Sequence, residues 1–258
     1  MLRPRLIPFL LLDGGGLVKT KNFKNPVYLG DPINTIKIFN EKKADEITVL
    51  DIKASFQKKE PDYGLIKKLA MECRMPICIG GGISKPDQVE KIIKLGVEKI
   101  SVNSSIFKNP NLIKEASQIV GSQSVAVTID YKKDFFTRRY SQYIFNGKEK
   151  VSRSITETIE YVQDQGAGEI IFNSIDHDGM MQGFDLDFFR LVQPYIKIPC
   201  TLVGGAGSVN HFRDLIDASN LNLGLGAGSY FVFKGKLRAV LISYPSEKEK
   251  KQMLQRIN

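Results

Sequence analysis

Four carboxylates stand where expected strands end, and they are the residues of this chain best placed to do chemistry: Asp51, Asp130, Asp176 and Asp178. Two opposed carboxylates in one site can divide the roles of proton donor and proton acceptor. The first strand ends near position 11 and carries Leu11 at the level that matches Asp130 in the second half of the chain. Leucine cannot move a proton, so Asp130 is the single catalytic carboxylate expected at that level.

Asp13 follows Leu11 by two residues and is the one nearby carboxylate that could replace the missing acid. It precedes Gly14, Gly15 and Gly16, and aspartate before glycine is typical of a turn. We therefore interpret Asp13 as a turn residue, with a catalytic role as the alternative.

Glycine-rich segments follow two other expected strands, at Gly80–Gly82 and Gly204–Gly207. Backbone N–H groups there can approach an anion closely, and a following helix N-terminus adds a favourable dipole. Ser104 and Ser229 can donate hydroxyl hydrogen bonds beside them. This arrangement predicts two phosphate sites, and simple turn glycines are the alternative.

The two halves of the chain repeat these features. The glycine segments lie 124 residues apart, and both the pair Asp51 and Asp176 and the pair Ser104 and Ser229 lie 125 residues apart. Agreement among three offsets indicates two fused half-barrels.

Four charged residues stand at the opposite ends of the strands: Arg5, Glu46, Lys99 and Glu169. Two cations and two anions at equivalent levels could form a neutral ring that plugs the bottom of a barrel. Separate surface salt bridges are the alternative.

The composition is that of an ordinary globular protein, with 42% hydrophobic residues, 25% charged residues and a net charge of +9. The positive charge suits a phosphorylated substrate, while the absence of interleaved aromatic and basic residues argues against nucleic acid. No apolar run is long enough to span a membrane. Three scattered cysteines and two histidines predict no disulfide framework, no metal site and a cytoplasmic location, and no cofactor is expected.

Eight short apolar runs alternate with amphipathic segments, which predicts a (β/α)8 TIM barrel built from two half-barrel repeats and spanning residues 1–258 as a single domain. An open doubly wound sheet is the alternative. The expected strands are Arg5–Leu12, Glu46–Asp51, Pro76–Gly80, Lys99–Asn103, Val125–Asp130, Glu169–Asn173, Pro199–Gly204 and Asn222–Ala227, and the expected helices include Pro32–Lys43, Lys85–Leu95, Leu112–Val120, Ile155–Gln165 and Phe212–Ala218.

Two segments interrupt this alternation. Residues 131–151 predict a β-hairpin above the fifth strand, with Asn146 and Gly147 as its turn. The segment 234–258 is atypical for the end of such a barrel: Leu237–Tyr244 predicts a strand and Glu247–Ile257 a short charged helix.

The chain resembles the cyclase subunit of imidazole glycerol phosphate synthase from Met1 to about Phe233. The resemblance is carried, in order, by Arg5-Leu6-Ile7-Pro8, Val18-Lys19, Gly30-Asp31-Pro32, Ala44-Asp45-Glu46, Asp51-Ile52-Lys53-Ala54-Ser55, Gly80-Gly81-Gly82-Ile83, Lys99-Ile100-Ser101-Val102-Asn103, Ile129-Asp130, Gly166-Ala167-Gly168-Glu169-Ile170, Ser174-Ile175-Asp176-His177-Asp178-Gly179, Gly183-Phe184-Asp185 and Gly204-Gly205-Ala206-Gly207.

The resemblance implies a barrel that takes ammonia from a glutaminase subunit docked at its N-terminal face, past a gate of Arg5, Glu46, Lys99 and Glu169. It makes Asp130 one of two catalytic aspartates and places Leu11 at the other. Implied substrate-binding residues are Lys19, Asp51, Asp176 and Asp178, and implied phosphate-binding residues are Gly81, Gly82, Asn103, Ser104, Gly205, Gly207, Gly228 and Ser229.

Two departures point to a branch of this family. Leu10–Thr20 and Phe233–Pro245 resemble paralogues found in surface-polysaccharide gene sets. Those paralogues are linked to conversion of a sugar acetamido group into an acetamidino group, beside a glutaminase-like protein and an ATP-using sugar amidotransferase. That chemistry needs delivered ammonia but no ring closure, which would explain Leu11, and it implies a phosphorylated small-molecule or nucleotide-sugar substrate.

Three functions follow as hypotheses. The first is an ammonia-using subunit for sugar amidination, and the second is a true histidine-pathway cyclase in which Asp13 substitutes for the missing aspartate. The third is a non-catalytic scaffold that carries ammonia between partners.

Overall fold

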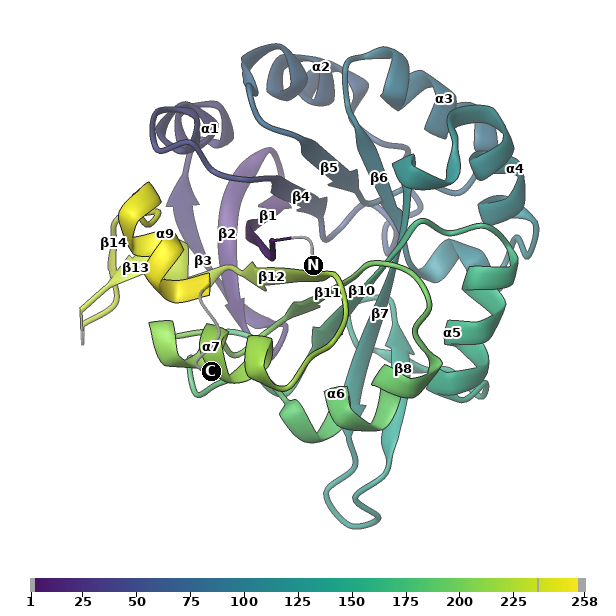
Figure 1. Cartoon of the computed structure of the whole chain (residues 1–258). Coiled ribbons are helices and arrows are strands. Elements are labelled where there is room, and N and C mark those ends of the chain that lie inside the picture. The colour runs from purple at the N-terminus through teal and green to yellow at the C-terminus, as the bar shows by residue number, and fades with distance from the viewer. Residues whose placement is uncertain (1–2, 236, 255–258) are drawn as a thin grey trace.

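The computed structural model describes residues 3–235 and 237–254 and has the expected (β/α)8 architecture (Figure 1). Eight parallel strands close a barrel in the order β1, β4, β5, β6, β7, β10, β11, β12 and back to β1. Their bounds are β1 Arg5–Asp13, β4 Ile47–Asp51, β5 Ile77–Gly80, β6 Lys99–Val102, β7 Val125–Lys133, β10 Glu169–Ser174, β11 Cys200–Val203 and β12 Leu223–Ala227. The barrel expected from the sequence is confirmed, and the open sheet is wrong.

Helices surround the barrel and cover its strands (Figure 1). Their bounds are α1 Pro32–Glu41, α2 Tyr63–Glu72, α3 Pro86–Lys94, α4 Leu112–Val120, α5 Ile155–Asp164, α6 Leu186–Val192, α7 Val209–Asp217, the short α8 Ser229–Val232, and α9 Glu247–Leu254. Side-chain caps fix several starts: Asp31 accepts from the Asn34 N–H, and Ser154 with Glu157 forms a capping box. The helices' apolar faces pack on the strands in one large buried cluster.

The interior of the barrel holds a second, smaller apolar cluster of Ile7, Phe9, Ala126, Ile171 and Val203. Glycines in β12 make room for it. A Cβ on Gly226 would lie 2.7 Å from the Phe9 ring, closer than real Cβ contacts allow. The barrel is therefore a packed core, and free space is found toward its mouth.

A hairpin that the sequence analysis did not expect follows β1. After the turn at Gly14 and Gly15, β2 (Gly16–Lys21) pairs antiparallel with β1, and β3 (Lys24–Gly30) pairs with β2. Positive φ angles at both turn glycines allow this tight reversal.

The excursion at 131–151 contains the expected hairpin and extends it by one strand. It has three strands, because β7 continues to Lys133, β8 (Tyr140–Ile144) pairs antiparallel with it, and β9 (Glu149–Lys150) pairs with β8. Asn146 and Gly147 turn the chain between β8 and β9, so the expected hairpin with this turn is confirmed. The pairing of β8 with an extended β7 was not expected.

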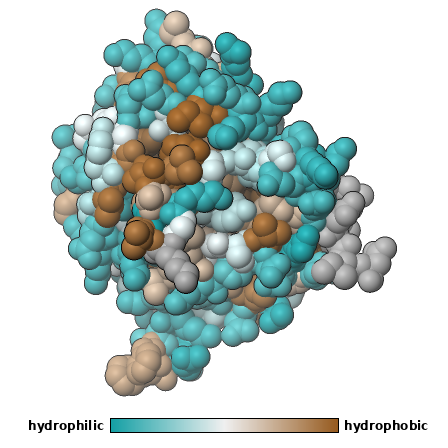
Figure 2. Space-filling model, turned by 90° about the vertical axis from the view of Figure 1, so that its left-hand side faces the viewer, coloured by the Kyte–Doolittle hydropathy of each residue, from teal (hydrophilic) through white to brown (hydrophobic). Residues whose placement is uncertain are grey.

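The C-terminal segment was only partly predicted. The expected strand Leu237–Tyr244 is wrong except at Ala239–Val240, which form β14 and pair with β13 (Phe233–Lys234). The charged helix is present as α9, and residues 255–257 of the expected helix lie outside the described residues. Apolar side chains gather on the face of the molecule shown in Figure 2. Val27, Val240 and Leu241 are among the exposed large apolar residues. None of the described helices is both long and apolar enough to cross a membrane.

Candidate active site

Two cavities open at the C-terminal ends of the strands, on either side of Leu11. The first, which we call the inner cavity, includes Asp130, Gly82 and Ser104 in its wall and has a volume of about 120 Å³. The second, which we call the distal cavity, includes Asp178, Gly205 and Ser229. Both cavities are lined in part by Leu11, Phe23, Leu50 and Asn173. The structure thus brings the two glycine segments to one mouth of the barrel, on opposite sides of a shared apolar divide.

Asp130 is buried in the wall of the inner cavity. Its carboxylate accepts hydrogen bonds from the amides of Asn103, at 2.8 Å, and Asn173, at 3.0 Å. Asn173 reaches it because β10 pairs in register with β7. Burial raises the pKa of Asp130 to about 7, although both amide hydrogen bonds act in the other direction. Asp130 can therefore hold or release a proton near neutral pH.

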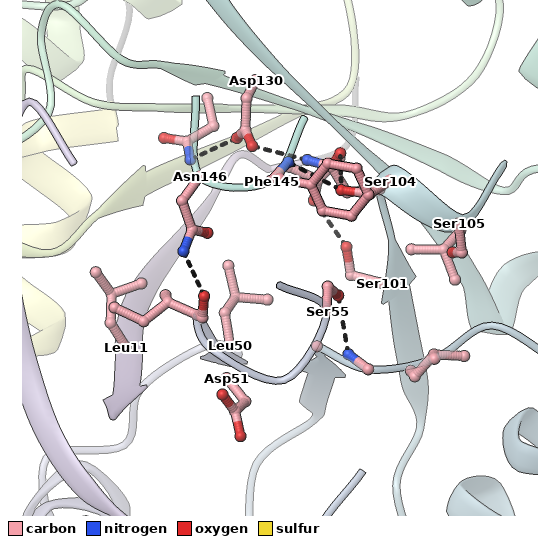
Figure 3. A pocket seen from close by; sticks show the side chains of 18 of the residues that line it. Leu11, Leu50, Asp51, Ser55, Ser101, Ser104, Ser105, Asp130, Phe145 and Asn146 are labelled. Carbon is pink, nitrogen blue, oxygen red and sulfur yellow. Dashed lines mark hydrogen bonds between the residues drawn. The ribbon is translucent and has the colours of Figure 1, made fainter. Parts of the chain in front are cut away.

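The position opposed to Asp130 carries Leu11, not a carboxylate. Leu11 faces the cavity from another side than Asp130 (Figure 3). Asp13 is the last residue of β1, and its carboxylate forms an ion pair with Lys53 at 2.6 Å. It does not belong to the lining of either cavity among the described residues. The geometry gives Asp13 no part in the inner cavity.

Lys19 and Asp178 form a buried ion pair in the distal cavity. The Asp178 carboxylate also accepts from the Thr20 hydroxyl at 2.6 Å and from the Phe23 N–H at 3.1 Å. All three donors lie on or just after β2. The unexpected hairpin is therefore what positions Lys19.

The other two predicted substrate carboxylates make backbone contacts. Asp51 lines the inner cavity, and its carboxylate accepts from the N–H groups of Lys53 and Ala54, both at 2.9 Å. Asp176 accepts from the Lys133 N–H at 2.9 Å and is not in the lining of either cavity among the described residues. Asp51 therefore lies in the wall of the inner cavity, whereas Asp176 is bonded to the end of β7, where the β7–β8 excursion begins.

At the inner cavity the predicted anion donors already have partners. The Gly82 N–H donates to the Ser55 hydroxyl at 3.1 Å, and the Ser104 hydroxyl accepts from the Phe145 N–H at 3.1 Å. Gly81 and Asn103 complete this end. The Asn146 amide donates to the Ile52 carbonyl at 2.5 Å. The turn between β8 and β9 therefore closes over the cavity as a lid.

At the distal cavity the expected residues Gly205, Gly228 and Ser229 line the wall. Arg238 adds a cation: its guanidinium donates to the Ser229 hydroxyl at 3.3 Å and to the Gly179 carbonyl at 3.0 Å. Gly207 instead packs against the Met181 backbone, where a Cβ would lie 2.4 Å from the carbonyl oxygen. Of the four residues expected to bind phosphate at this end, Gly207 is the one outside the lining of the distal cavity.

The four charges at the barrel bottom form a closed ring of ion pairs. Arg5 contacts Glu46 and Glu169, and Lys99 contacts the same two carboxylates. The Arg5–Glu169 and Lys99–Glu46 distances are 2.9 and 2.8 Å. Burial would raise the pKa of Glu169, but Lys99 and Arg5 hold it below its usual value. Glu169 therefore stays charged at neutral pH.

Hydroxyl groups continue from this ring toward the inner cavity. Thr201 donates to Glu169 at 2.5 Å. Higher in the barrel, Ser101 and Thr128 hydrogen-bond to each other at 2.7 Å, and both line the inner cavity. Within residues 3–235 and 237–254, no group of histidine, cysteine and acidic residues is arranged to hold a metal ion.

A family known as "Histidine biosynthesis protein" matches residues 5–238. The chain belongs to this family. Over 255 residues it is 50% identical to the "Putative imidazole glycerol phosphate synthase subunit hisF3" of Vibrio vulnificus, covering 99% of this chain and 98% of the relative. The subunit hisF2 of Pseudomonas aeruginosa, with the same "putative" form of name, is 47% identical, covering 95% and 97%. The "Imidazole glycerol phosphate synthase subunit HisF" of Staphylococcus saprophyticus is 35% identical, covering 88% and 90%.

Several residues of this histidine-biosynthesis barrel site escaped the sequence analysis. Asn173 hydrogen-bonds to Asp130, Phe145 and Asn146 form the lid, and Arg238 hydrogen-bonds to Ser229 in the wall of the distal cavity. Asn173 could have been found, because it ends an expected strand next to Asp130. No sequence pattern predicts that Arg238 lies near Ser229, because its position depends on how the C-terminal segment folds back.

Proposed function

We propose that this barrel receives ammonia at its charged ring and delivers it through the barrel to the cavities at its mouth. The single observation that carries this proposal is the closed ring of Arg5, Glu46, Lys99 and Glu169, which is present although the opposed carboxylate above it is absent. A buried ion network is a poor device for stability alone, because apolar packing often does as well. Paired ions that can part and re-form suit a gate.

The ammonia would come from a glutaminase subunit docked on the N-terminal face, around Arg5, Glu46, Glu98, Lys99 and Glu169. Ammonia is small and neutral, so it can cross an interior of hydroxyl and apolar side chains. Thr201 next to the ring, and Ser101 with Thr128 below the inner cavity, offer hydrogen-bonding partners along such a route.

The reaction at the mouth would be conversion of a sugar acetamido group into an acetamidino group for a surface polysaccharide. Ammonia replaces the amide oxygen, which leaves on a phosphate from ATP, so an ATP-using sugar amidotransferase would be the third partner. Proton transfer by a carboxylate pair is not required of the barrel in that reaction. A single Asp130, with a pKa of about 7, could accept the proton that the nitrogen loses when ammonia forms its new bond to the amide carbon.

A histidine-pathway cyclase is the second candidate, because imidazole glycerol phosphate synthase subunits are among the relatives and Asp130 lies in the inner cavity. Against it stands Leu11, since loss of one of two proton-transfer groups typically costs ~10²–10⁴-fold in rate. Complementation of a strain that lacks the histidine cyclase separates the two. Growth would favour the cyclase, and failure to grow favours amidination.

The decisive experiment on the ring is co-purification with the candidate glutaminase, followed by assays of Lys99→Ala and Glu169→Ala. We expect glutamine-driven product formation to fall while activity with free ammonium salts holds up. If no glutaminase binds, or if both ammonia sources are affected equally, the ring is structural and the channel is refuted.

A further inference from the structure

A third pocket, besides the inner and distal cavities, adjoins the inner cavity at Phe145 of the lid, and we call it the outer pocket. Its charged lining consists of Lys58, Lys59, Lys85, Lys108 and Glu60. Ser55, Gly82, Ser104 and Phe145 line both the outer pocket and the inner cavity. The two spaces therefore meet at the predicted anion donors, with Phe145 of the lid between them.

The four lysines come from three separate elements. Lys58 and Lys59 lie in the loop after β4, Lys85 caps α3, and Lys108 ends the 3₁₀ turn after β6. The loop is held in place, since the Lys59 N–H donates to the Ala54 carbonyl at 2.9 Å. Residues distant in sequence are thus brought together on fixed backbone around one hollow.

This lining has an excess of positive charge. In the described part of the chain, none of the four ammonium groups has a carboxylate within ion-pair distance, and Lys108 lies over the Phe145 ring at 4.7 Å. With Glu60 as the one acidic group, the pocket has a net charge of about +3. Clustered like charges repel one another unless an anion joins them.

We propose that the outer pocket binds a diphosphate group of the ligand whose reactive part lies in the inner cavity. A diphosphate carries two to three negative charges near neutral pH, as estimated from roughly −1.5 to −2 for a single phosphate monoester. That charge matches this lining, whereas a single phosphate would leave part of it unbalanced. Lysine ammonium groups bind phosphate as point charges and suit such a flexible anion. This inference rests on the proposed function, because it names the substrate class of the same site.

Calorimetric titration of the full chain with inorganic pyrophosphate tests the inference. The variant is Lys85→Ala with Lys108→Ala. The matched control is Lys67→Ala with Lys68→Ala, two exposed lysines of α2 outside this pocket. We expect the pocket variant to bind pyrophosphate at least tenfold more weakly and the control to stay within twofold of the wild type. Equal affinity in variant and control, or no binding to the wild type, would overturn the inference.

Two further ligands identify the source of the diphosphate. Inorganic phosphate should bind more weakly than pyrophosphate and lose less affinity in the variant. If the diphosphate is part of a nucleotide, the variant should lose at least as much affinity for uridine diphosphate as for pyrophosphate. If the variant binds phosphate and uridine diphosphate as tightly as the wild type does, the outer pocket is not a diphosphate site. Binding needs no glutaminase and no turnover, so failure of ammonia transfer would leave this result standing.

Discussion

Replacement of Lys99 by methionine tests whether the ring is a coupled network. The variant removes one of two cations that hold Glu46 and Glu169, whose side chains are 6% and 5% exposed. Loss of one partner of a buried pair typically costs ~3–5 kcal/mol. Arg5 still contacts both carboxylates and Lys99 is 14% exposed, so we expect a loss at or just below the lower end of that range, about 2–3 kcal/mol in the free energy of unfolding.

The free energy of unfolding that Lys99→Met loses should depend on pH. The folded-state pKa of Glu169 is depressed, so its stabilisation is present above the unfolded pKa and is lost as pH falls through the folded value. Lys99→Met weakens that depression, and the difference between variant and wild type should be largest at pH 7 and shrink below about pH 4.5. Urea unfolding at pH 7 and pH 4 measures it. The control is Lys94→Met, an exposed lysine paired with Glu90, for which we expect less than about 0.5 kcal/mol. A Lys99→Met effect no larger than the control, or one independent of pH, would refute the reasoning.

Three further predictions concern the mouth of the barrel. Leu11→Asp should raise ammonium-dependent cyclase activity on the histidine-pathway substrate at least about tenfold, a partial recovery of the ~10²–10⁴-fold that a proton-transfer group contributes, while Leu11→Asn should not; equal rates in the two variants would show that position 11 is not the site of the missing acid. By carboxyl-carbon NMR, Asp130 should titrate near pH 7, and Asn173→Ala should raise that midpoint because the Asn173 amide stabilises the charged carboxylate. Asp130→Asn should increase the free energy of unfolding, and this gain should grow as pH rises from 4 to 7 and then level off. An Asp130 midpoint near pH 4 would contradict both expectations. Gly82→Ala should lower the free energy of unfolding by ~1–3 kcal/mol, because φ at Gly82 is +75° and a Cβ would lie 2.6 Å from the Lys59 carbonyl oxygen. Gly64→Ala in α2 should be neutral or stabilising. Similar effects at both sites would show that Gly82 is not required by its backbone conformation.

Sequence patterns predicted those features that depend on strand order and strand ends. The repeated glycine and serine positions place the Gly82 and Gly205 segments at one mouth, because parallel strands in a closed barrel end on the same side. The same geometry brings Arg5, Glu46, Lys99 and Glu169 together at the bottom.

Features that depend on loop paths were not predicted. The β2–β3 hairpin that positions Lys19, the fold-back that brings Arg238 to Ser229, and the lid contact of Phe145 with Ser104 each join segments without a shared periodicity. The sequence signals at Gly14–Gly15 and Asn146–Gly147 indicate turns, but a turn signal does not predict which part of the molecule the flanking strands pack against.

Isotope competition in the reconstituted complex tests the central claim most directly. The barrel, its glutaminase and the sugar amidotransferase would be given glutamine labelled with ¹⁵N in its amide, together with excess unlabelled ammonium. Transfer through the barrel predicts that the amidine nitrogen keeps most of the label in the wild type and loses it in Lys99→Met. If the label is diluted in the wild type in proportion to free ammonium, ammonia reaches the sugar through solvent and the account is wrong.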